Sequence, residues 1–322
     1  MAESKVSSKR SDDDLFVVIL AGGIGSRFWP ASTPNRPKQL LALATDSPLV
    51  VDTFRRGAGI VPVNQVRLLA NARLTAAFQA LPEQWEDDVY WVEPRARGTC
   101  PALAWAAWSI ERECPGAVMI SLHSDHLIEP LDDFQRTISA AVELARNREI
   151  LVCIGAVPDR IETGYGHIQP AESITLESEI EASTVSAFHE KPNATNAERY
   201  LQEGYLWNTG MFVWKASTFL NEVRVNAPEI GACLPLLEES PEAFFDAVPE
   251  GPVDTMVLER SACVGVVQAS FSWDDMGSWE SLARNRAPDE DHNVVVGDGT
   301  VREGSNNIVF SEAGQVVLFG VD

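Results

Sequence analysis

The chain has 322 residues, which at roughly 150 residues per domain allows two domains or one large domain with an appendage. Hydrophobic residues make up 45% of the chain and charged residues 22%, a balance that excludes collagen, coiled coils and wholesale disorder. Because 47 acidic residues face 25 lysines and arginines, the formal net charge is −22, and we expect no binding to nucleic acid or to anionic membranes.

The amino-terminal segment and the cysteines indicate the cellular location. Residues 1–14 are polar and lack the apolar segment of a secretory signal, so we interpret them as a disordered tail. The five cysteines form no CxxC pair and the five histidines show no metal-ligand spacing, which argues against a disulfide framework and a zinc site. Together these features predict a cytoplasmic protein.

Short apolar runs alternate with amphipathic stretches along the first half of the chain. We predict strands at the apolar runs and helices where apolar residues recur at helical spacing. The predicted strands are Phe16–Leu20, Val66–Ala70, Val89–Val92, Ala117–Leu122 and Leu151–Ile154, and the predicted helices are Pro101–Glu111 and Asp133–Ala145. Strands that alternate with helices predict an α/β fold, in which a mostly parallel, Rossmann-like sheet carries helices on both faces.

The residue composition and the pattern of apolar runs change twice in the second half of the chain. From about residue 160, glycine, proline and aromatic residues become frequent, which indicates an α+β half that carries a binding surface. The short runs Val294–Val296, Ile308–Phe310 and Val316–Phe319 predict a C-terminal all-β tail. Because the sequence stops at Asp322 directly after an apolar run, we expect a truncated chain.

The predicted first strand runs into the sequence AGGIGSR, from Ala21 to Arg27. Glycines beyond the carboxyl end of a parallel strand let backbone N–H groups approach phosphate oxygens. The loop is not a Walker A motif, and it is a poor dinucleotide fingerprint because Phe28 and Pro30 interrupt the pattern. Arg27 as a bidentate fork and Lys38 as a point charge suit a nucleoside triphosphate. The alternative interpretation is a glycine-rich turn with a solvated arginine.

The segment LAGGIGSRFWPASTPNRPKQLLAL resembles the opening signature of sugar nucleotidyltransferases, and its FWP and RPKQ forms resemble the mannose-1-phosphate guanylyltransferase (GDP-mannose pyrophosphorylase) branch. The resemblance continues through six motifs in order over about residues 15–322 and implies a GT-A-like nucleotidyltransferase fold. It divides the chain into a nucleotidyltransferase domain at 15–288 and a C-terminal β segment at 289–322. The domain consists of a nucleotide-binding half at about 15–155 and a sugar-binding half at about 156–288.

The resemblance implies the nucleotide and metal sites. The family's metal-binding acids correspond to Asp125 in SDH and to Asp275 in WDDMGSW, where alignment on Gly277 favours Asp275 over Asp274. Carboxylate oxygens at strand ends suit Mg²⁺. The implied nucleotide-binding residues are Ala21, Gly22, Gly23, Gly25, Ser26, Arg97, Gly98 and Thr99.

The segment EPRARGTCPA resembles the family's base-contacting segment, which commonly reads RNTAP. Gly98 stands here where Asn is usual, which leaves the mode of base recognition open, although glycine permits a close backbone contact. The same residues also predict a helix start, with Thr99 as the cap and Pro101 at the first helical position.

Three further motifs resemble the family's sugar site: ETGYGHI, FHEKP and WNTGMF. They imply substrate-binding roles for Gly166, Glu190, Lys191 and Asn208, with Glu190 on sugar hydroxyls and Lys191 on the sugar phosphate. His167 replaces a common tyrosine. The segment PVDTMVLE resembles the family's SIDYxVLE, and no role is assigned to it.

The resemblance implies a Mg²⁺-dependent reaction in which mannose 1-phosphate attacks the α-phosphate of GTP in line, forming GDP-mannose and pyrophosphate. The nucleophile is already an anion, so catalysis consists of positioning and charge neutralisation by Arg27, Lys38 and Lys191. The alternatives are the same chemistry with another NTP or sugar 1-phosphate, a non-catalytic regulatory subunit of this fold, and a dinucleotide-dependent oxidoreductase. We expect a homodimer.

Overall fold

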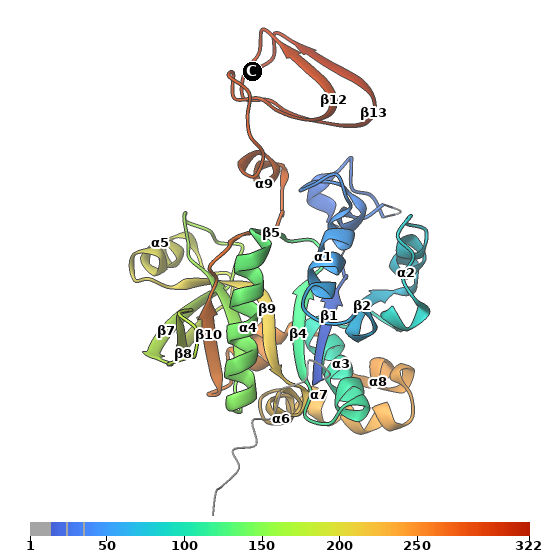
Figure 1. Ribbon diagram of the computed structural model, residues 1–322, viewed down its shortest axis with the longest axis vertical. Coiled ribbons are helices and arrows are strands. Elements are labelled where there is room, and N and C mark those ends of the chain that lie inside the picture. The colour runs from blue at the N-terminus through green and yellow to red at the C-terminus, as the bar shows by residue number, and fades with distance from the viewer. Residues whose placement is uncertain (1–13, 24, 35) are drawn as a thin grey trace, which may run out of the picture. The chain divides into compact units, whose positions relative to one another are not determined.

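The computed structural model describes residues 14–23, 25–34 and 36–322 (Figure 1). The predicted disordered tail therefore lies outside the described residues except for Asp14. That residue is not disordered as predicted, because its carboxylate forms an ion pair with Arg146.

The chain forms two compact units that interleave along the sequence. The first unit runs to Gly22 and continues over Thr53–Ser124 and Ile128–Ser272. The second unit comprises Gly23–Asp52, Asp125–Leu127 and Trp273–Asp322. The domain boundaries expected from the sequence remain predictions.

The first unit is built on a nine-stranded sheet with the order β3-β2-β1-β4-β9-β6-β10-β8-β7 (Figure 1). Its strands are β1 (Leu15–Leu20), β2 (Val66–Asn71), β3 (Tyr90–Glu93), β4 (Val118–His123), β6 (Leu151–Ala156), β7 (His167–Ser173), β8 (Ala182–His189), β9 (Leu206–Lys215) and β10 (Val264–Gln268). Neighbours among β3, β2, β1 and β4 are parallel, as are β6 and β10, whereas β9 and β8 run antiparallel to their neighbours. The predicted α/β fold with a mostly parallel sheet is confirmed.

Strand β1 lies at the centre of the core because its sequence, LFVVIL, has no polar residue and is buried along its whole length. Phe16 and Val18 belong to the large apolar cluster that helices α3 (Thr99–Glu113) and α6 (Ala216–Asn226) complete on one face. On the other face, Gly57 of α1 (Leu49–Ala58) lies so close that a Cβ there would come within 3.0 Å of Val17. The remaining helices of this unit are α2 (Ala72–Gln79), α4 (Leu131–Asn147), α5 (Ala194–Gln202), α7 (Pro228–Gly231) and α8 (Pro241–Ala247).

The second unit has a core of its own, assembled from segments far apart in the sequence. Phe28, Leu41 and Leu43 pack with Met276 and Leu282. The unit also contains helix α9 (Trp279–Arg284), which begins with a capping box between Ser278 and Ser281. A small sheet of the chain pairs β5 (Leu127–Glu129) with β11 (Ser272–Asp274), and a boundary between the units falls within each of these strands.

The C-terminal segment forms two parallel strands, β12 (Val294–Arg302) and β13 (Ile308–Phe319). The predicted runs Ile308–Phe310 and Val316–Phe319 both pair with β12, and a single strand, β13, contains both. The register shifts between the two runs, because Gly297 pairs with Ser311 and Gly299 pairs with Val316, so that residues 312–315 of β13 lie opposite a single residue of β12.

Within the described part of the chain, no helix combines the length and the apolar character needed to cross a membrane.

Candidate active site

The glycine loop begins in the first unit, where β1 ends. Ala21 is buried, and its N–H donates to the carbonyl oxygen of Leu69 at 2.9 Å. Gly22 is exposed, and a Cβ at this position would meet no atom of the described chain within 4 Å. The backbone immediately beyond β1 is therefore open to an approaching group.

The loop continues in the second unit through Gly23 and Gly25, which both adopt positive φ angles, 88° and 67°. A Cβ on Gly25 would lie 2.4 Å from the Cβ of Lys38. Both the backbone conformation and this close approach require glycine at position 25. Lys38 is thereby packed directly against the glycine loop.

The short 3₁₀-helix η2 (Ser26–Phe28) follows Gly25. Ser26 and Arg27 are exposed to solvent. Phe28 is fully buried and meets the ring of Trp279 edge-on, with 5.0 Å between the ring centroids. The phenylalanine that breaks the dinucleotide fingerprint is thus a core residue, and it anchors the helix that presents Arg27.

Lys38 is the buried cation of the second unit's polar cluster. Its side chain is 6% exposed and its Nζ lies 2.8 Å from Asp125 Oδ2. The same ammonium group donates to the backbone oxygen of Asp275 at 2.7 Å. An ammonium ion taken out of water needs such partners, because the cost of removing its hydration would otherwise exceed the gain from packing. The Lys38 ammonium group therefore contacts the carboxylate of one predicted metal acid, Asp125, and the backbone oxygen of the other, Asp275.

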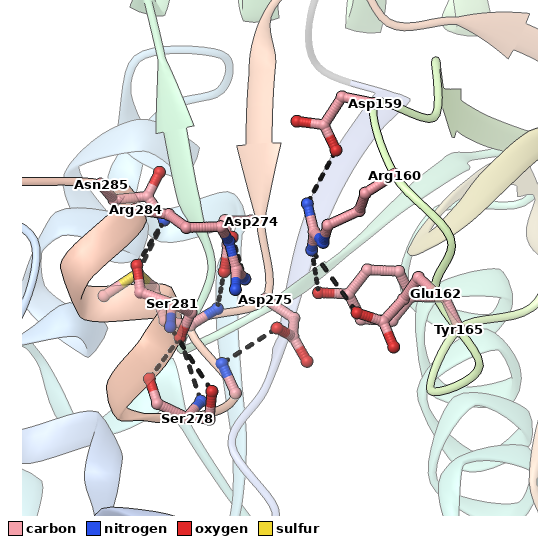
Figure 2. A network of polar contacts seen from close by, with 12 residues as sticks. Asp159, Arg160, Glu162, Tyr165, Asp274, Asp275, Ser278, Ser281, Arg284 and Asn285 are labelled. Carbon is pink, nitrogen blue, oxygen red and sulfur yellow. Dashed lines mark hydrogen bonds and ion pairs between the residues drawn. The ribbon is translucent and has the colours of Figure 1, made fainter.

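The two adjacent acids of the WDDMGSW motif have different environments, as Figure 2 shows. Asp274 is buried and accepts from Arg284 Nη2 at 2.9 Å and from the N–H of Met276 at 2.8 Å. Asp275 accepts from the N–H of Gly277 at 2.9 Å. Asp274 therefore holds the turn to helix α9, whereas Asp275 lies at the lysine.

The donor set around Lys38 suits a hard divalent cation. Asp125 contributes a carboxylate oxygen at Lys38 Nζ, whereas Asp275 contributes its backbone oxygen there. Carboxylate and backbone oxygens are ligands that hard divalent cations prefer. His126 has a different role, because its Nδ1 accepts from the Nε1–H of Trp273 at 3.1 Å, which fixes the imidazole against the indole edge. The structure brings both residues to Lys38, and their role as Mg²⁺ ligands remains a prediction.

The three sugar-site motifs meet in the first unit. Asn208 on β9 donates its backbone N–H to the carbonyl oxygen of Gly166 at 2.8 Å. A Cβ on Gly166 would lie 2.6 Å from Glu190 Oε2 and 3.2 Å from Asn208 Cβ. The absence of a side chain at Gly166 thus allows the Glu190 carboxylate and Asn208 to approach the same backbone.

Two acids that the sequence analysis left without a role belong to this cluster. Asp254 Oδ1 accepts from Asn208 Nδ2 at 2.8 Å, and Glu259 Oε1 accepts from the backbone N–H of Glu190 at 2.9 Å. Burial, reinforced by the nearby Glu190, raises the pKa of Asp254 to about 6, although the hydrogen bond from Asn208 opposes this shift. Both acids lie in PVDTMVLE, and the resemblance of this segment to a family motif was the signal that could have identified them.

Lys191 is held by its backbone, whereas its side chain is largely exposed. Its φ angle is 48°, and its N–H donates to the carbonyl oxygen of Tyr165 at 3.3 Å. A positive φ at a residue other than glycine is strained and is maintained only where the surroundings impose it. The ammonium group forms an ion pair with Glu190.

The loop before Gly166 is fixed by Arg160, as Figure 2 shows. Its guanidinium pairs with Asp159 at 2.8 Å and donates to the Tyr165 hydroxyl at 3.4 Å. It also lies over the Trp207 ring, 4.7 Å from the centroid. A cation stacked on an aromatic face is a stabilising arrangement, so the loop backbone has a defined position.

The predicted base-contacting residues form a separate group in the first unit. Arg97 Nε donates to the carbonyl oxygen of Phe245 at 2.9 Å. Gly98 adopts φ 83° and ψ 176°, a conformation open essentially to glycine alone, and a Cβ there would lie 2.6 Å from the Gly251 oxygen. The local backbone conformation and the close approach of Gly251 therefore require glycine at position 98, where the family commonly has Asn.

Thr99 does not cap helix α3 as predicted. The helix begins at Thr99 itself and Gly98 occupies the cap position, so Pro101 lies at the third helical position. The Thr99 hydroxyl accepts instead from the N–H of Val253 at 2.9 Å. The Thr99 side chain thus links the start of helix α3 to the loop that contains Val253.

Glu93 ends strand β3 next to this group. Burial raises the pKa of its carboxyl to about 7, and a hydrogen bond from the Arg97 backbone partly offsets the shift. Because the sequence analysis considered Glu93 only as part of a longer motif, its environment is a finding of the structure.

Comparison with known proteins identifies the family. The nucleotidyl transferase family model matches residues 16–292. The mannose-1-phosphate guanylyltransferase of Escherichia coli K12 is 36% identical over 95% of this chain and 67% of its own length. The alginate biosynthesis protein AlgA of Pseudomonas syringae pv. tomato is 33% identical over 95% of this chain and 65% of its own length. The chain thus spans about two thirds of the length of these relatives.

A solved structure is similar over nearly the whole chain. The mannose-1-phosphate geranyltransferase of Thermus thermophilus has a TM-score of 0.87 and 28% identity, and the match covers 96% of this chain and 90% of that protein. The fold, the order of the motifs and the match over residues 16–292 agree, and the chain belongs to the nucleotidyl transferase family.

Proposed function

We propose that the chain transfers the guanylyl group of GTP to mannose 1-phosphate, releasing pyrophosphate and forming GDP-mannose. The observation that carries this proposal is Lys38, a buried ammonium group packed against the glycine loop and shared by Asp125 and Asp275. A cation, two carboxylates and open glycine backbone are the groups that bind a metal-complexed triphosphate. The name of the Escherichia coli relative, a mannose-1-phosphate guanylyltransferase, supports the substrates.

The chemistry requires positioning more than acid–base catalysis. The phosphate of a sugar 1-phosphate is an anion at neutral pH, so it attacks the α-phosphate without a general base. Arg27 and Lys38 bind the triphosphate and stabilise the charge on the departing pyrophosphate, and Lys191 offsets the repulsion between the two anionic substrates. Backbone N–H groups at Gly22, Gly23, Gly25 and Ser26 contribute further donors, whereas the N–H of Ala21 is used by the Leu69 carbonyl oxygen.

Asp125 and Asp275 hold the divalent cation, which we propose is Mg²⁺. When bound, the metal neutralises charge on the phosphate oxygens of the triphosphate. In the first unit, Gly166, Glu190 and Asn208 bind the hydroxyls of the sugar, and Arg97, Gly98 and Thr99 lie at the base. The protein acts in the cytoplasm and as a homodimer under this proposal, without nucleic-acid or membrane partners.

Two departures from the family pattern favour a second candidate, the same chemistry with another base or sugar. Gly98 offers only backbone to a base. His167 is buried, with its Nδ1 3.1 Å from the Tyr165 oxygen and its ring against Tyr200, so it differs chemically from the tyrosine usual at this position.

The test is pyrophosphate release in a matrix of four NTPs and three sugar 1-phosphates, those of mannose, glucose and galactosamine, with Mg²⁺. We expect release with GTP and mannose 1-phosphate alone. Release with another pair supports the second candidate. If protein shown to be folded releases pyrophosphate with none of these combinations, the result would reject catalysis by this chain and favour a regulatory subunit.

A further inference from the structure

A single turn of π-helix separates the two acids of the sugar cluster. Residues Asp254–Leu258 form this turn, and the N–H of Glu259 donates to the carbonyl oxygen of Asp254 at 2.8 Å. In an α-helix, with 3.6 residues per turn, positions five apart point to different sides. The wider π turn brings residues i and i+5 close to the same side. Asp254 and Glu259 can therefore act on one site.

Asp254 fixes the side chain of Asn208. The amide nitrogen of Asn208 donates to Asp254 Oδ1 at 2.8 Å, and the amide oxygen accepts from the N–H of Gly210 at 3.1 Å. Because an amide has distinct donor and acceptor ends, these two bonds define which end points where. The second N–H of the Asn208 amide and the second lone pair of its oxygen therefore point in defined directions.

Glu259 fixes the backbone of the FHEKP motif. Its Oε1 accepts from the backbone N–H of Glu190 at 2.9 Å. The Glu190 carboxylate in turn lies against Gly166, where a Cβ would approach Oε2 to 2.6 Å. The backbone from which the Glu190 carboxylate extends is thus tied to the far end of the same π turn.

We propose that Asp254 and Glu259 are positioning residues, which use the π turn to hold Asn208 and Glu190 in the orientation that recognises the hydroxyl pattern of the sugar. The inference rests on the proposed sugar site and adds the groups that define its stereochemistry. Hydroxyls of epimeric sugars differ in direction, so an amide and a carboxylate of fixed direction discriminate between them by leaving the wrong epimer's hydroxyl unpaired.

Matched substitutions separate positioning from folding. In Asp254→Asn the new amide oxygen can still accept from Asn208, whereas Asp254→Ala removes the acceptor. Glu259→Gln and Glu259→Ala make the same distinction for Glu190. Glu149→Gln is the control, because Glu149 contacts Lys215 and Thr218 and no residue of the sugar cluster.

Steady-state kinetics with the best sugar 1-phosphate of the matrix give the main readout. We expect Asp254→Ala and Glu259→Ala to raise KM for the sugar phosphate about tenfold or more, since each leaves a hydrogen-bonding group unpaired. Both variants should also discriminate less between one epimer of the sugar phosphate and the other. KM for the nucleotide should stay within twofold. Asp254→Asn and Glu259→Gln should restore the sugar KM. An unchanged sugar KM in both alanine variants, or an equal rise in both KM values, would overturn the proposal.

A second readout does not depend on turnover. The Asn208 side-chain amide gives ¹⁵N NMR resonances that can be assigned with Asn208→Asp. We expect slow hydrogen exchange of this amide in the wild type and in Asp254→Asn, and fast exchange in Asp254→Ala. Equal exchange in all three proteins would contradict the positioning role even if the substrate were not mannose 1-phosphate.

Discussion

The two polar clusters, one in each unit, differ in their balance of charge. Around Lys38 a buried cation is matched by Asp125 and by the backbone oxygen of Asp275. Around Asn208 the acids predominate, because Asp254, Glu190 and Glu259 are accompanied by one largely exposed lysine. With the proposed divalent cation bound, the first arrangement would suit a substrate that brings negative charge. The second is rich in acceptors and suits the neutral hydroxyls of a sugar.

The most severe test of this comparison is removal of the cation. Lys38→Met should lower turnover about 100- to 1,000-fold, because a donor aimed at developing phosphate charge is lost. Pyrophosphate release and circular dichroism are the measurements. Lys215→Met is the control, since Lys215 pairs with Glu149 and not with the cluster. Near-normal turnover of Lys38→Met would remove the basis for the phosphate site.

Asp275, the proposed metal ligand, should give the next largest effect. Asp275→Asn keeps an oxygen for the N–H of Gly277 but loses the charge that attracts Mg²⁺. Loss of groups that only orient metal ligands costs about 10- to 100-fold in affinity, so we expect at least tenfold weaker apparent binding of Mg²⁺. Activity is titrated with Mg²⁺, and the exposed Asp298→Asn serves as reference. An identical titration curve for both variants would show that Asp275 is not a ligand.

The sugar cluster should respond to added bulk rather than to lost charge. Gly166→Ala places a methyl group 2.6 Å from Glu190 Oε2, so the carboxylate must move, and we expect KM for the sugar phosphate to rise about tenfold. Gly164→Ala is the matched control in the same loop, because its methyl would approach only the flexible end of Glu162, at 3.2 Å. Equal KM values for the two variants would argue against a sugar at Gly166.

The smallest effect is one of stability. The pKa of Asp254 is about 6 in the folded protein, above the ordinary value of 3.8, so the folded state binds more protons between these pH values. The stability contributed by this group is complete below about pH 4 and is lost as pH rises through about 6. Asp254→Asn, which has no charge to bury, should therefore gain on the order of 2 kcal/mol relative to the wild type between pH 4 and pH 7. Urea unfolding at both pH values measures this, and a constant difference would contradict the raised pKa.

The sequence predicted five of the nine strands of the large sheet, because buried strands such as β1 and β4 are continuous apolar runs. It did not predict β7, β8, β9 and β10. It predicted the two paired runs of β13 but not that they belong to one strand with an irregularity between them. It also misplaced the cap of α3, because Thr99 has a partner 154 residues away in Val253.

The candidate site was predictable only where a residue's role is contained in a local motif. Lys38 and Asp125 were identified as single residues, but their pairing across the sequence is a property of the fold. Asp254 and Glu259 escaped assignment for the same physical reason. Their function depends on a π turn and on partners at positions 208 and 190, and no periodicity in the sequence encodes either.

The interleaving of the second unit has a consequence for synthesis. Phe28, Leu41 and Leu43 emerge early from a ribosome, but their core partners Met276 and Leu282 are translated about 230 residues later, at 5–20 residues per second. Sheet strands such as β1, β2 and β4 can pair long before then. The nascent chain therefore carries its glycine loop with an incomplete hydrophobic support for many seconds. That support is complete only after Leu282 has been translated, so a chain that stopped before Met276 would hold a formed sheet and an unsupported loop.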